Sequence, residues 1–155
     1  MRIMLTTWSL ALLMSITPSG AVAQSSSGGP SAERFLGSWV LVDWRSTNDS
    51  GEVTFSFGEE ASGQIVYTRD GRMSAQLMNP LADPPGEPNQ FLSYWGGYEV
   101  DLGAGTVTHK VIGANLANLI GSDQVRNFEF EGPDRLVLSL GENRLIWERT
   151  RTQRR

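Results

Sequence analysis

Apolar and polar residues alternate in several short stretches of the chain, most clearly in Gly121–Glu131. Successive side chains of an extended strand point to opposite faces, which groups Phe128 with Phe130. Gln124 and Arg126 share that aromatic face, whereas the two glutamates of the stretch lie on the other. Because the aromatic face belongs in the interior, the pattern predicts an interior guanidinium, which needs hydrogen-bond acceptors from the protein or from a ligand.

Similar short stretches, separated by Gly, Pro, Asn and Asp, continue along most of the chain. We expect further strands at 38–44, 53–57, 64–68, 73–78, 91–101, 106–112, 135–140 and 144–149. Asp70-Gly71 predicts a tight hairpin, and Gly96-Gly97 predicts a bulge or bend within a strand. Since no segment is patterned as a helix that could cover a sheet, the sheet hides its edges best by closing on itself. The sequence therefore predicts an all-β fold: a single up-and-down antiparallel β-barrel of about eight to ten strands, with few or no helices.

Three connections stand out between the expected strands. Ser31–Leu36 is expected to form one helical turn, with Ser31 as its cap and Phe35 and Leu36 docked on the barrel. Gly113–Gly121 is mildly apolar and is expected to cross one barrel end. Asn79–Gln90 contains four prolines, which exclude a regular helix or a central strand, and a loop of this length is typical of a lid or rim.

The N-terminus has the pattern of a secretory signal. Arg2 is followed by the mostly apolar Ile3–Ile16 and by Ala21-Val22-Ala23, which fits a cleavage site. We therefore expect a signal peptide at 1–23 and a periplasmic or secreted protein; a retained anchor is the alternative, although the apolar run is short. The expected order continues with a flexible linker and turn at 24–34, the barrel at 35–150 and a basic tail at 151–155. The tail is a solvated end or, alternatively, an anchor to an anionic surface.

Composition narrows the classes of function. A chain of 155 residues is expected to form one domain, and its net charge of −4 gives no reason to expect nucleic acid as a partner. The chain has no cysteine, which excludes disulfides, thiol catalysis and cysteine-based metal sites. Serine-nucleophile, phosphate-loop and zinc motifs are absent as well. We expect no cofactor, no metal, no stable membrane insertion after signal cleavage, and a monomer.

The opening Gly37-Ser38-Trp39 is similar to the Gly-x-Trp motif of the lipocalin superfamily. Five further segments follow in order at 65–74, 94–100, 107–109, 121–128 and 146–149. Together they make Phe35–Arg149 resemble the lipocalin-like domain family of bacteria and fungi. The resemblance implies a small barrel with a hydrophobic interior cavity. It also implies that the tryptophan packs under an arginine near the last strand, for which Arg149 is the candidate. The proline-rich loop and Leu116, where the family has proline, depart from the family pattern.

Arg126 is the leading candidate to contact a ligand, because a guanidinium matches a carboxylate in two parallel hydrogen bonds. Alternatively it is a structural arginine held by Glu99, Gln124 or backbone carbonyls. His109 is the only histidine, and it is expected to be a packed residue, a polar ligand contact or a general acid or base. Alternation places Glu99 on the surface unless the glycine bend changes the register. The candidate ligand-binding residues are Arg126, His109, Gln124, Tyr94, Glu99, Tyr67 and Trp95.

The remaining aromatic residues are expected in the core or the cavity lining: Phe55, Phe57, Phe128, Phe130, Trp95 and Trp147. The expected function is an exported binder of a small hydrophobic molecule, with or without an acidic head group. One alternative is an isomerase, cyclase or hydratase that uses an interior cluster of His109, Glu99 and Arg126. The other is a structural envelope protein without a ligand. No residue is assigned a catalytic or metal-binding role.

Overall fold

The computed structural model describes residues 31–82 and 90–151. The expected signal peptide, most of the expected linker, most of the proline-rich loop and most of the expected basic tail therefore lie outside the described residues. Two short 3-10 helices and nine strands follow one another in the chain. They are η1 (Ala32–Phe35), β1 (Gly37–Thr47), β2 (Val53–Thr54), β3 (Ser62–Tyr67), β4 (Arg72–Met78), β5 (Phe91–Asp101), β6 (Thr106–Ala114), η2 (Ala117–Leu119), β7 (Asp123–Phe130), β8 (Arg135–Leu140) and β9 (Asn143–Arg149). None of the described helices is long and apolar enough to cross a membrane.

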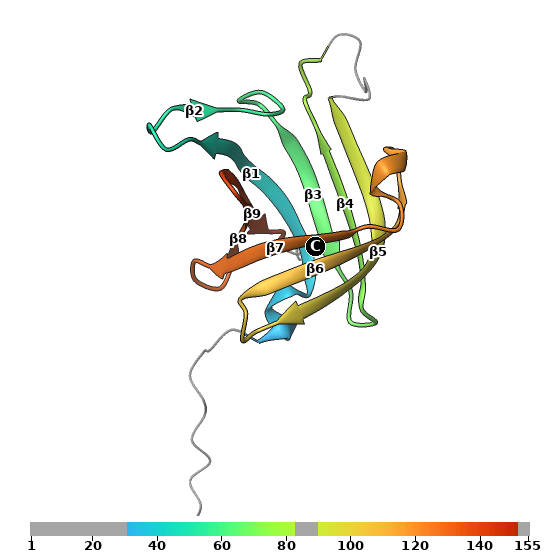
Figure 1. Ribbon diagram of the computed structural model, residues 1–155. Coiled ribbons are helices and arrows are strands. Elements are labelled where there is room, and N and C mark those ends of the chain that lie inside the picture. Colours follow the sequence, from blue (N-terminus) through green and yellow to red (C-terminus); the bar gives the residue numbers. More distant parts are fainter. Residues whose placement is uncertain (1–30, 83–89, 152–155) are drawn as a thin grey trace, which may run out of the picture.

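Eight of the strands close into an antiparallel barrel (Figure 1). From β3 to β9 each strand pairs with the next one in sequence, β1 pairs with β3, and β1 also pairs with β9 to close the ring. β2 pairs only with the end of β1, through Ser46 and Thr47. The predicted fold class, an up-and-down β-barrel with few helices, is confirmed.

Strand alternation places the interior residues as the sequence predicts. Along β7, Gln124, Arg126 and the two phenylalanines are partly buried, and every residue between them is exposed. Along β6, Val107, His109 and Val111 are buried. The barrel interior is therefore apolar except for a few polar side chains that alternation directs inward.

One end of the barrel is closed by η1, at the bottom of Figure 1. Phe35 is fully buried and packs edge-on against Tyr67, with the ring centroids 5.3 Å apart. Arg149 lies over the Trp39 ring, with its guanidinium carbon 4.1 Å from the ring centroid. Its Nη1 donates to the carbonyl oxygen of Leu36 at 2.6 Å. The expected docking of η1 and the expected arginine–tryptophan contact are both present, and they stabilise this end. Ser31 occupies the N-cap position of η1 without a side-chain capping hydrogen bond.

The first strand departs from the simple alternation. Its register against β9 shifts between Leu41 and Asp43, so one extra residue is accommodated and the strand changes face. Alternation over 38–44 predicts Trp44 on the same face as Val40 and Val42, but Trp44 turns toward the interior, whereas both valines are exposed. This prediction is therefore wrong, and the bulge is the reason.

The second strand is much shorter than the expected 53–57, because only Val53–Thr54 pair with β1. Phe55 is 36% exposed, so its expected place in the core or cavity lining is wrong. Phe57 stacks on Trp44 instead of facing the barrel core, with the ring centroids 4.5 Å apart. Since two residues of pairing do not hold a strand against the barrel, the alternation of 53–57 does not govern burial here.

The register of β5 against β6 shifts between Trp95 and Gly96, beside the predicted glycines, but the extra residue is Ile112 of β6 and not a residue of β5. A Cβ at Gly96 would lie 1.9 Å from the carbonyl oxygen of Lys110. Gly96→Ala is therefore expected to lower the free energy of unfolding by about 1–3 kcal/mol, because two paired backbones must separate. Urea unfolding checks this. The matched control is Gly97→Ala, whose nearest atom would be 3.6 Å away, and equal losses in the two variants would contradict the steric account.

Candidate functional site

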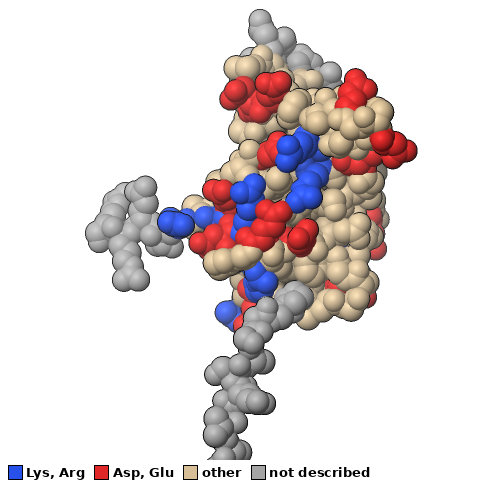
Figure 2. Space-filling model, turned by 90° about the vertical axis from the view of Figure 1, so that its left-hand side faces the viewer, with Lys and Arg blue, Asp and Glu red and all other residues tan. Residues whose placement is uncertain are grey.

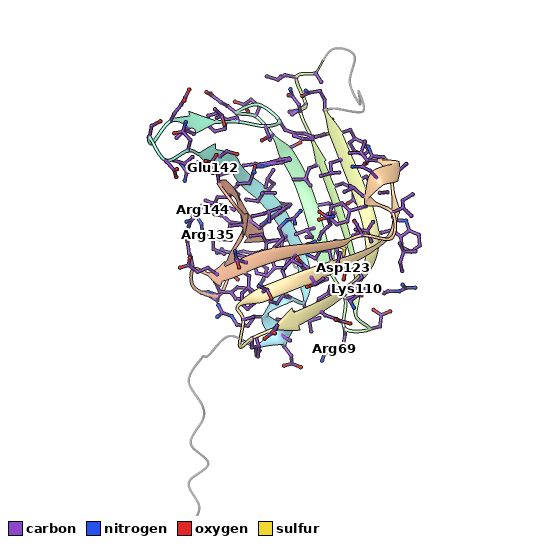
Figure 3. The ribbon with its side chains drawn as sticks, viewed as in Figure 1. Arg69, Lys110, Asp123, Arg135, Glu142 and Arg144 are labelled. Atoms are coloured by element: carbon purple, nitrogen blue, oxygen red, sulfur yellow. The ribbon has the colours of Figure 1, made fainter. Side chains whose placement is uncertain are left out.

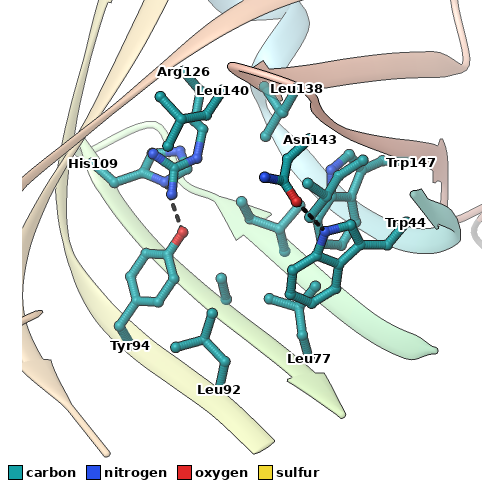
Figure 4. Close-up of a pocket in the computed structure, with 13 residues that line it drawn as sticks. Trp44, Leu77, Leu92, Tyr94, His109, Arg126, Leu138, Leu140, Asn143 and Trp147 are labelled. Atoms are coloured by element: carbon teal, nitrogen blue, oxygen red, sulfur yellow. Dashed lines mark hydrogen bonds between the residues drawn. The ribbon is translucent and has the colours of Figure 1, made fainter. Parts of the chain in front are cut away.

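The barrel encloses a cavity of about 190 Å³. It lies on the side away from η1, toward the end at which β4 ends and β5 begins. Aliphatic side chains, among them five leucines, form most of its wall together with the rings of Trp44 and Trp147 (Figure 4). Leu140, which is 51% exposed, also lines it, so the cavity reaches the surface at the β8–β9 turn. Apolar cavities of this kind bind apolar molecules in preference to water.

Four polar side chains interrupt the apolar wall: Tyr94, His109, Arg126 and Asn143. They come from β5, β6, β7 and β9. In the register of β6 against β7, Val107 is opposite Arg126, and His109 is opposite Gln124. The histidine and the arginine are therefore diagonal neighbours on the inner face of adjacent strands, as Figure 4 shows.

His109 is 1% exposed and lies between two tyrosine hydroxyls. Its Nε2 is 2.7 Å from the Tyr67 hydroxyl oxygen, and its Nδ1 is 3.0 Å from that of Tyr94. Tyr67 belongs to β3, which is not a neighbour of β6, so the first of these bonds crosses the barrel interior. Both ring nitrogens of the histidine are satisfied in this way. We call the series Tyr67–His109–Tyr94 the hydrogen-bond chain.

Burial sets the protonation states of the three residues in the hydrogen-bond chain. Desolvation, with a smaller contribution from the Arg126 charge, lowers the pKa of His109 to about 3. Desolvation raises the pKa of Tyr94 to about 12 and raises the pKa of Tyr67 well above its ordinary value. At neutral pH all three side chains are therefore uncharged, and among the described residues that line the cavity Arg126 is the one charged group.

Arg126 is held by neutral acceptors. Its Nη1 donates to the Val125 carbonyl oxygen at 2.9 Å, and its Nη2 donates to Gln124 Oε1 at 3.2 Å. The amide nitrogen of Gln124 in turn donates to the Ser122 hydroxyl at 2.8 Å. In the described part of the chain, no carboxylate lies within salt-bridge distance of Arg126. The guanidinium is therefore positioned by the protein but not neutralised by it.

Sequence reasoning missed two polar groups of the site, Asn143 and the indole nitrogen of Trp147. Asn143 Oδ1 accepts hydrogen bonds from Trp44 Nε1 at 3.3 Å and from the Ser46 hydroxyl at 2.8 Å. Trp147 Nε1 is buried and has no acceptor among the described residues. Asn143 lies between the strands expected at 135–140 and 144–149, and no sequence pattern indicates that it begins β9 and reaches the cavity.

Two of the predicted site residues lie on the outer surface. Glu99 is directed away from the barrel, and its Oε1 is 3.0 Å from Lys110 Nζ, on the outer face where Figure 3 labels Lys110. Trp95 is 50% exposed. Alternation along β5 continues through the glycines, so Tyr94 and Tyr98 lie inward and their neighbours outward. The surface position that alternation gives Glu99 is therefore confirmed, whereas the candidate places of Trp95 and Glu99 in the cavity wall are wrong. The expected interior cluster of His109, Glu99 and Arg126 is therefore not assembled.

The other predicted residues are brought together. Tyr94, His109 and Arg126 line the cavity, whereas Tyr67 and Gln124 stand behind them and hold them in place. Across 31–82 and 90–151, no three His, Cys, Asp or Glu side chains gather in a way that could hold a metal ion.

The outer surface near β8 and β9 carries interspersed charges of both signs (Figure 2). Glu131 contacts two arginines that Figure 3 labels: its Oε2 is 3.1 Å from Arg135 Nε, and its Oε1 is 2.7 Å from Arg144 Nη2. Partly exposed ion pairs of this kind contribute little each. The described residues of this face therefore form no extended surface of one sign.

Comparison with known proteins agrees with the fold. The crystal structure of a lipocalin-like protein from Bacteroides uniformis ATCC 8492 aligns with a TM-score of 0.51 at 14% identity, covering 76% of this chain and 99% of that one. An uncharacterized protein from Bacteroides eggerthii DSM 20697 aligns with a TM-score of 0.47 at 11% identity, covering 75% and 99%. No curated protein matches the chain. The family model described as lipocalin-like domain matches residues 36–155. The chain therefore belongs to the lipocalin-like domain family.

Proposed function

We propose that this protein binds one small hydrophobic molecule with an acidic head group inside its barrel. The observation that carries the proposal is an apolar cavity in which one cation, Arg126, has no carboxylate partner among the described residues. A largely apolar pocket with a few fixed polar groups is typical of a small-molecule site.

The apolar wall supplies the affinity in this proposal. Each CH₂ group of a ligand that leaves water for such a wall gains about 0.8 kcal/mol. The two tryptophans of the wall, Trp44 and Trp147, add flat surfaces against which a ring can pack. These groups have no means of orienting a ligand, so orientation falls to the polar residues.

The head group is bound by Arg126 in this proposal. Its guanidinium is held at one edge by Val125 and Gln124, and a guanidinium has five N–H donors in a rigid plane. Donors that the protein does not use remain for an anion. A carboxylate fits them best, because it accepts two parallel hydrogen bonds from one guanidinium.

The cellular site that we propose is the periplasm or the exterior, which the pattern at 1–23 favours. In that setting a carrier or scavenger of small acids needs no cofactor and no second subunit. We also propose that the protein works as a monomer, and that neither nucleic acid nor a membrane is its partner.

Native mass spectrometry of the protein purified from its own host tests this function. We expect a fraction with one bound small molecule, and solvent extraction of that fraction should yield an apolar acid. The control is the same protein refolded from urea and then offered the host extract, which should restore the mass shift. A protein that is empty as isolated and takes up neither host acids nor toluene would contradict the proposal.

A further inference from the structure

We propose that each polar side chain of the cavity wall presents a hydrogen-bond donor to the occupant, and that hydrogen bonds running from Tyr67 through His109 to Tyr94 make Tyr94 one of these donors. The site then selects a small, deprotonated carboxylic acid of aryl or comparable size. This inference rests on the proposed function and specifies its ligand class.

The donor and acceptor of each hydrogen bond in the hydrogen-bond chain follow from its most buried residue, Tyr67. Tyr67 is 1% exposed, and His109 Nε2 is the one partner of its hydroxyl in the described residues. A buried hydroxyl that does not donate is costly, so the hydrogen of Tyr67 points to Nε2. Nε2 is therefore the acceptor nitrogen of a neutral imidazole, and the ring proton sits on Nδ1.

The direction of the second hydrogen bond, between His109 and Tyr94, follows from that tautomer. The Nδ1–H of His109 donates to the Tyr94 hydroxyl oxygen across 3.0 Å. This leaves the Tyr94 hydrogen free, and among the described residues it has no other acceptor. Tyr94 lines the cavity beside Arg126 (Figure 4), so its hydroxyl donates to whatever occupies the cavity.

The other polar groups of the wall are donors too. Arg126 has donors only. Asn143 uses its amide oxygen to accept from Trp44 and Ser46, which leaves its NH₂ group. Trp147 Nε1 is a buried donor without an acceptor in the part of the chain that the structure describes. An alcohol accepts from these donors with one neutral oxygen, and the remaining lone pair of the Tyr94 hydroxyl is the acceptor left for its own hydrogen. An amine would add a second cation, whereas a carboxylate has two charged oxygens that only accept.

The volume limits the size of the acid. A dry apolar cavity of about 150 Å³ accepts a benzene molecule, and this one measures about 190 Å³. It therefore holds a six-membered ring with a short carboxylate-bearing arm, roughly ten non-hydrogen atoms. A long-chain fatty acid would leave most of its tail outside, because enclosed sites for larger ligands measure about 300–1,000 Å³.

Calorimetric titration with matched probes tests the ligand class. We expect trans-cinnamate to bind with one site per chain, cinnamyl alcohol to bind at least about 10-fold more weakly, and cinnamylamine to show no binding. Palmitate should bind no more tightly than cinnamate. Toluene separates the proposed function from the inference about the ligand class. If toluene and cinnamyl alcohol bind as well as cinnamate, the cavity is a binding site but its donors do not select a carboxylate. If no probe binds, both proposals fail.

Two variants, Tyr94→Phe and Tyr67→Phe, test the hydrogen-bond chain itself. Tyr94→Phe is expected to weaken cinnamate binding about 10- to 100-fold, because a hydrogen bond to a charged group is lost. Tyr67 does not line the cavity, yet Tyr67→Phe should also weaken cinnamate binding, by about 3- to 10-fold. The reason is that the His109 tautomer that makes Tyr94 a donor is no longer fixed. The control is Tyr98→Phe, which removes a hydroxyl that donates to the Thr68 carbonyl oxygen outside the cavity. Full cinnamate affinity in Tyr67→Phe would contradict the role of the chain.

The tautomer can be observed without any ligand, because the protein has one histidine. Nitrogen-15 NMR of the His109 ring is expected to show a protonated Nδ1 and an unprotonated Nε2 in the wild-type protein at neutral pH. In folded Tyr67→Phe the two nitrogens should shift toward a mixture. An Nε2–H tautomer in the wild-type protein would overturn the inference, since Tyr94 would then donate to the histidine.

Discussion

An Arg126→Gln variant is expected to bind a small carboxylic acid at least about 100-fold more weakly than the wild-type protein. Two hydrogen bonds from a guanidinium to a carboxylate are lost, and a hydrogen bond to a charged group contributes about 1.5–3 kcal/mol. Arg126→Lys should lie between the two, because an ammonium keeps the charge but not the planar pair of donors. Calorimetric titration with trans-cinnamate gives all three affinities.

The controls for this prediction separate charge from packing. Arg69→Gln removes a positive charge from a side chain that is 79% exposed on the outside, so cinnamate affinity should stay within about twofold, as exposed charges are screened. Toluene, which has no head group, should bind Arg126→Gln about as well as the wild type. If Arg126→Gln loses toluene and cinnamate alike, the arginine supports the cavity instead of binding the head group.

His109 is expected to make the protein less stable as pH falls. Its pKa in the folded state is about 3, against 6.5 as the ordinary value, so below pH 6.5 the unfolded chain binds a proton that the folded protein does not. The contribution is full above pH 6.5 and is lost as pH falls toward 3, at up to about 1.4 kcal/mol per pH unit. Burial is the main cause, and the groups that face the ring are Tyr67, Tyr94 and the charged Arg126.

Urea unfolding at several pH values checks this against a His109→Gln variant, because carboxylates elsewhere titrate in both proteins. Glutamine keeps one donor and one acceptor but does not titrate. The stability difference between wild type and variant should shrink by about 2–3 kcal/mol between pH 7 and pH 4.5. Parallel curves for the two proteins would mean that the ring accepts a proton in the folded state.

The barrel could be predicted from the sequence because its evidence is local. Alternation in 121–131 requires only that aromatic residues be buried, and it placed Gln124 and Arg126 inside with them. The hairpin at Asp70-Gly71 likewise follows from residue types with known backbone preferences. Such preferences act within a few residues, so they survive whatever the rest of the chain does.

The arrangement of the site could not be predicted in the same way. The tyrosines that flank His109 are 42 and 15 residues away from it in sequence, and only closure of the barrel brings Tyr67 across to the ring. The bulge in β1 shows the complementary difficulty: one extra residue turns Trp44 into the cavity, and no residue near Val42 marks the place. An alternating pattern predicts which face of the sheet a residue occupies only as far as the first bulge, because one extra residue moves the following side chains to the other face.

A crystal structure of the protein soaked or grown with trans-cinnamate tests the central claim most directly. We expect the ring between Trp44 and Trp147 in the cavity, with the carboxylate within hydrogen-bond distance of both the Arg126 guanidinium and the Tyr94 hydroxyl. A cavity that stays empty while cinnamate occupies the outer surface, or a carboxylate that points out to solvent with Arg126 unbound, would contradict the account.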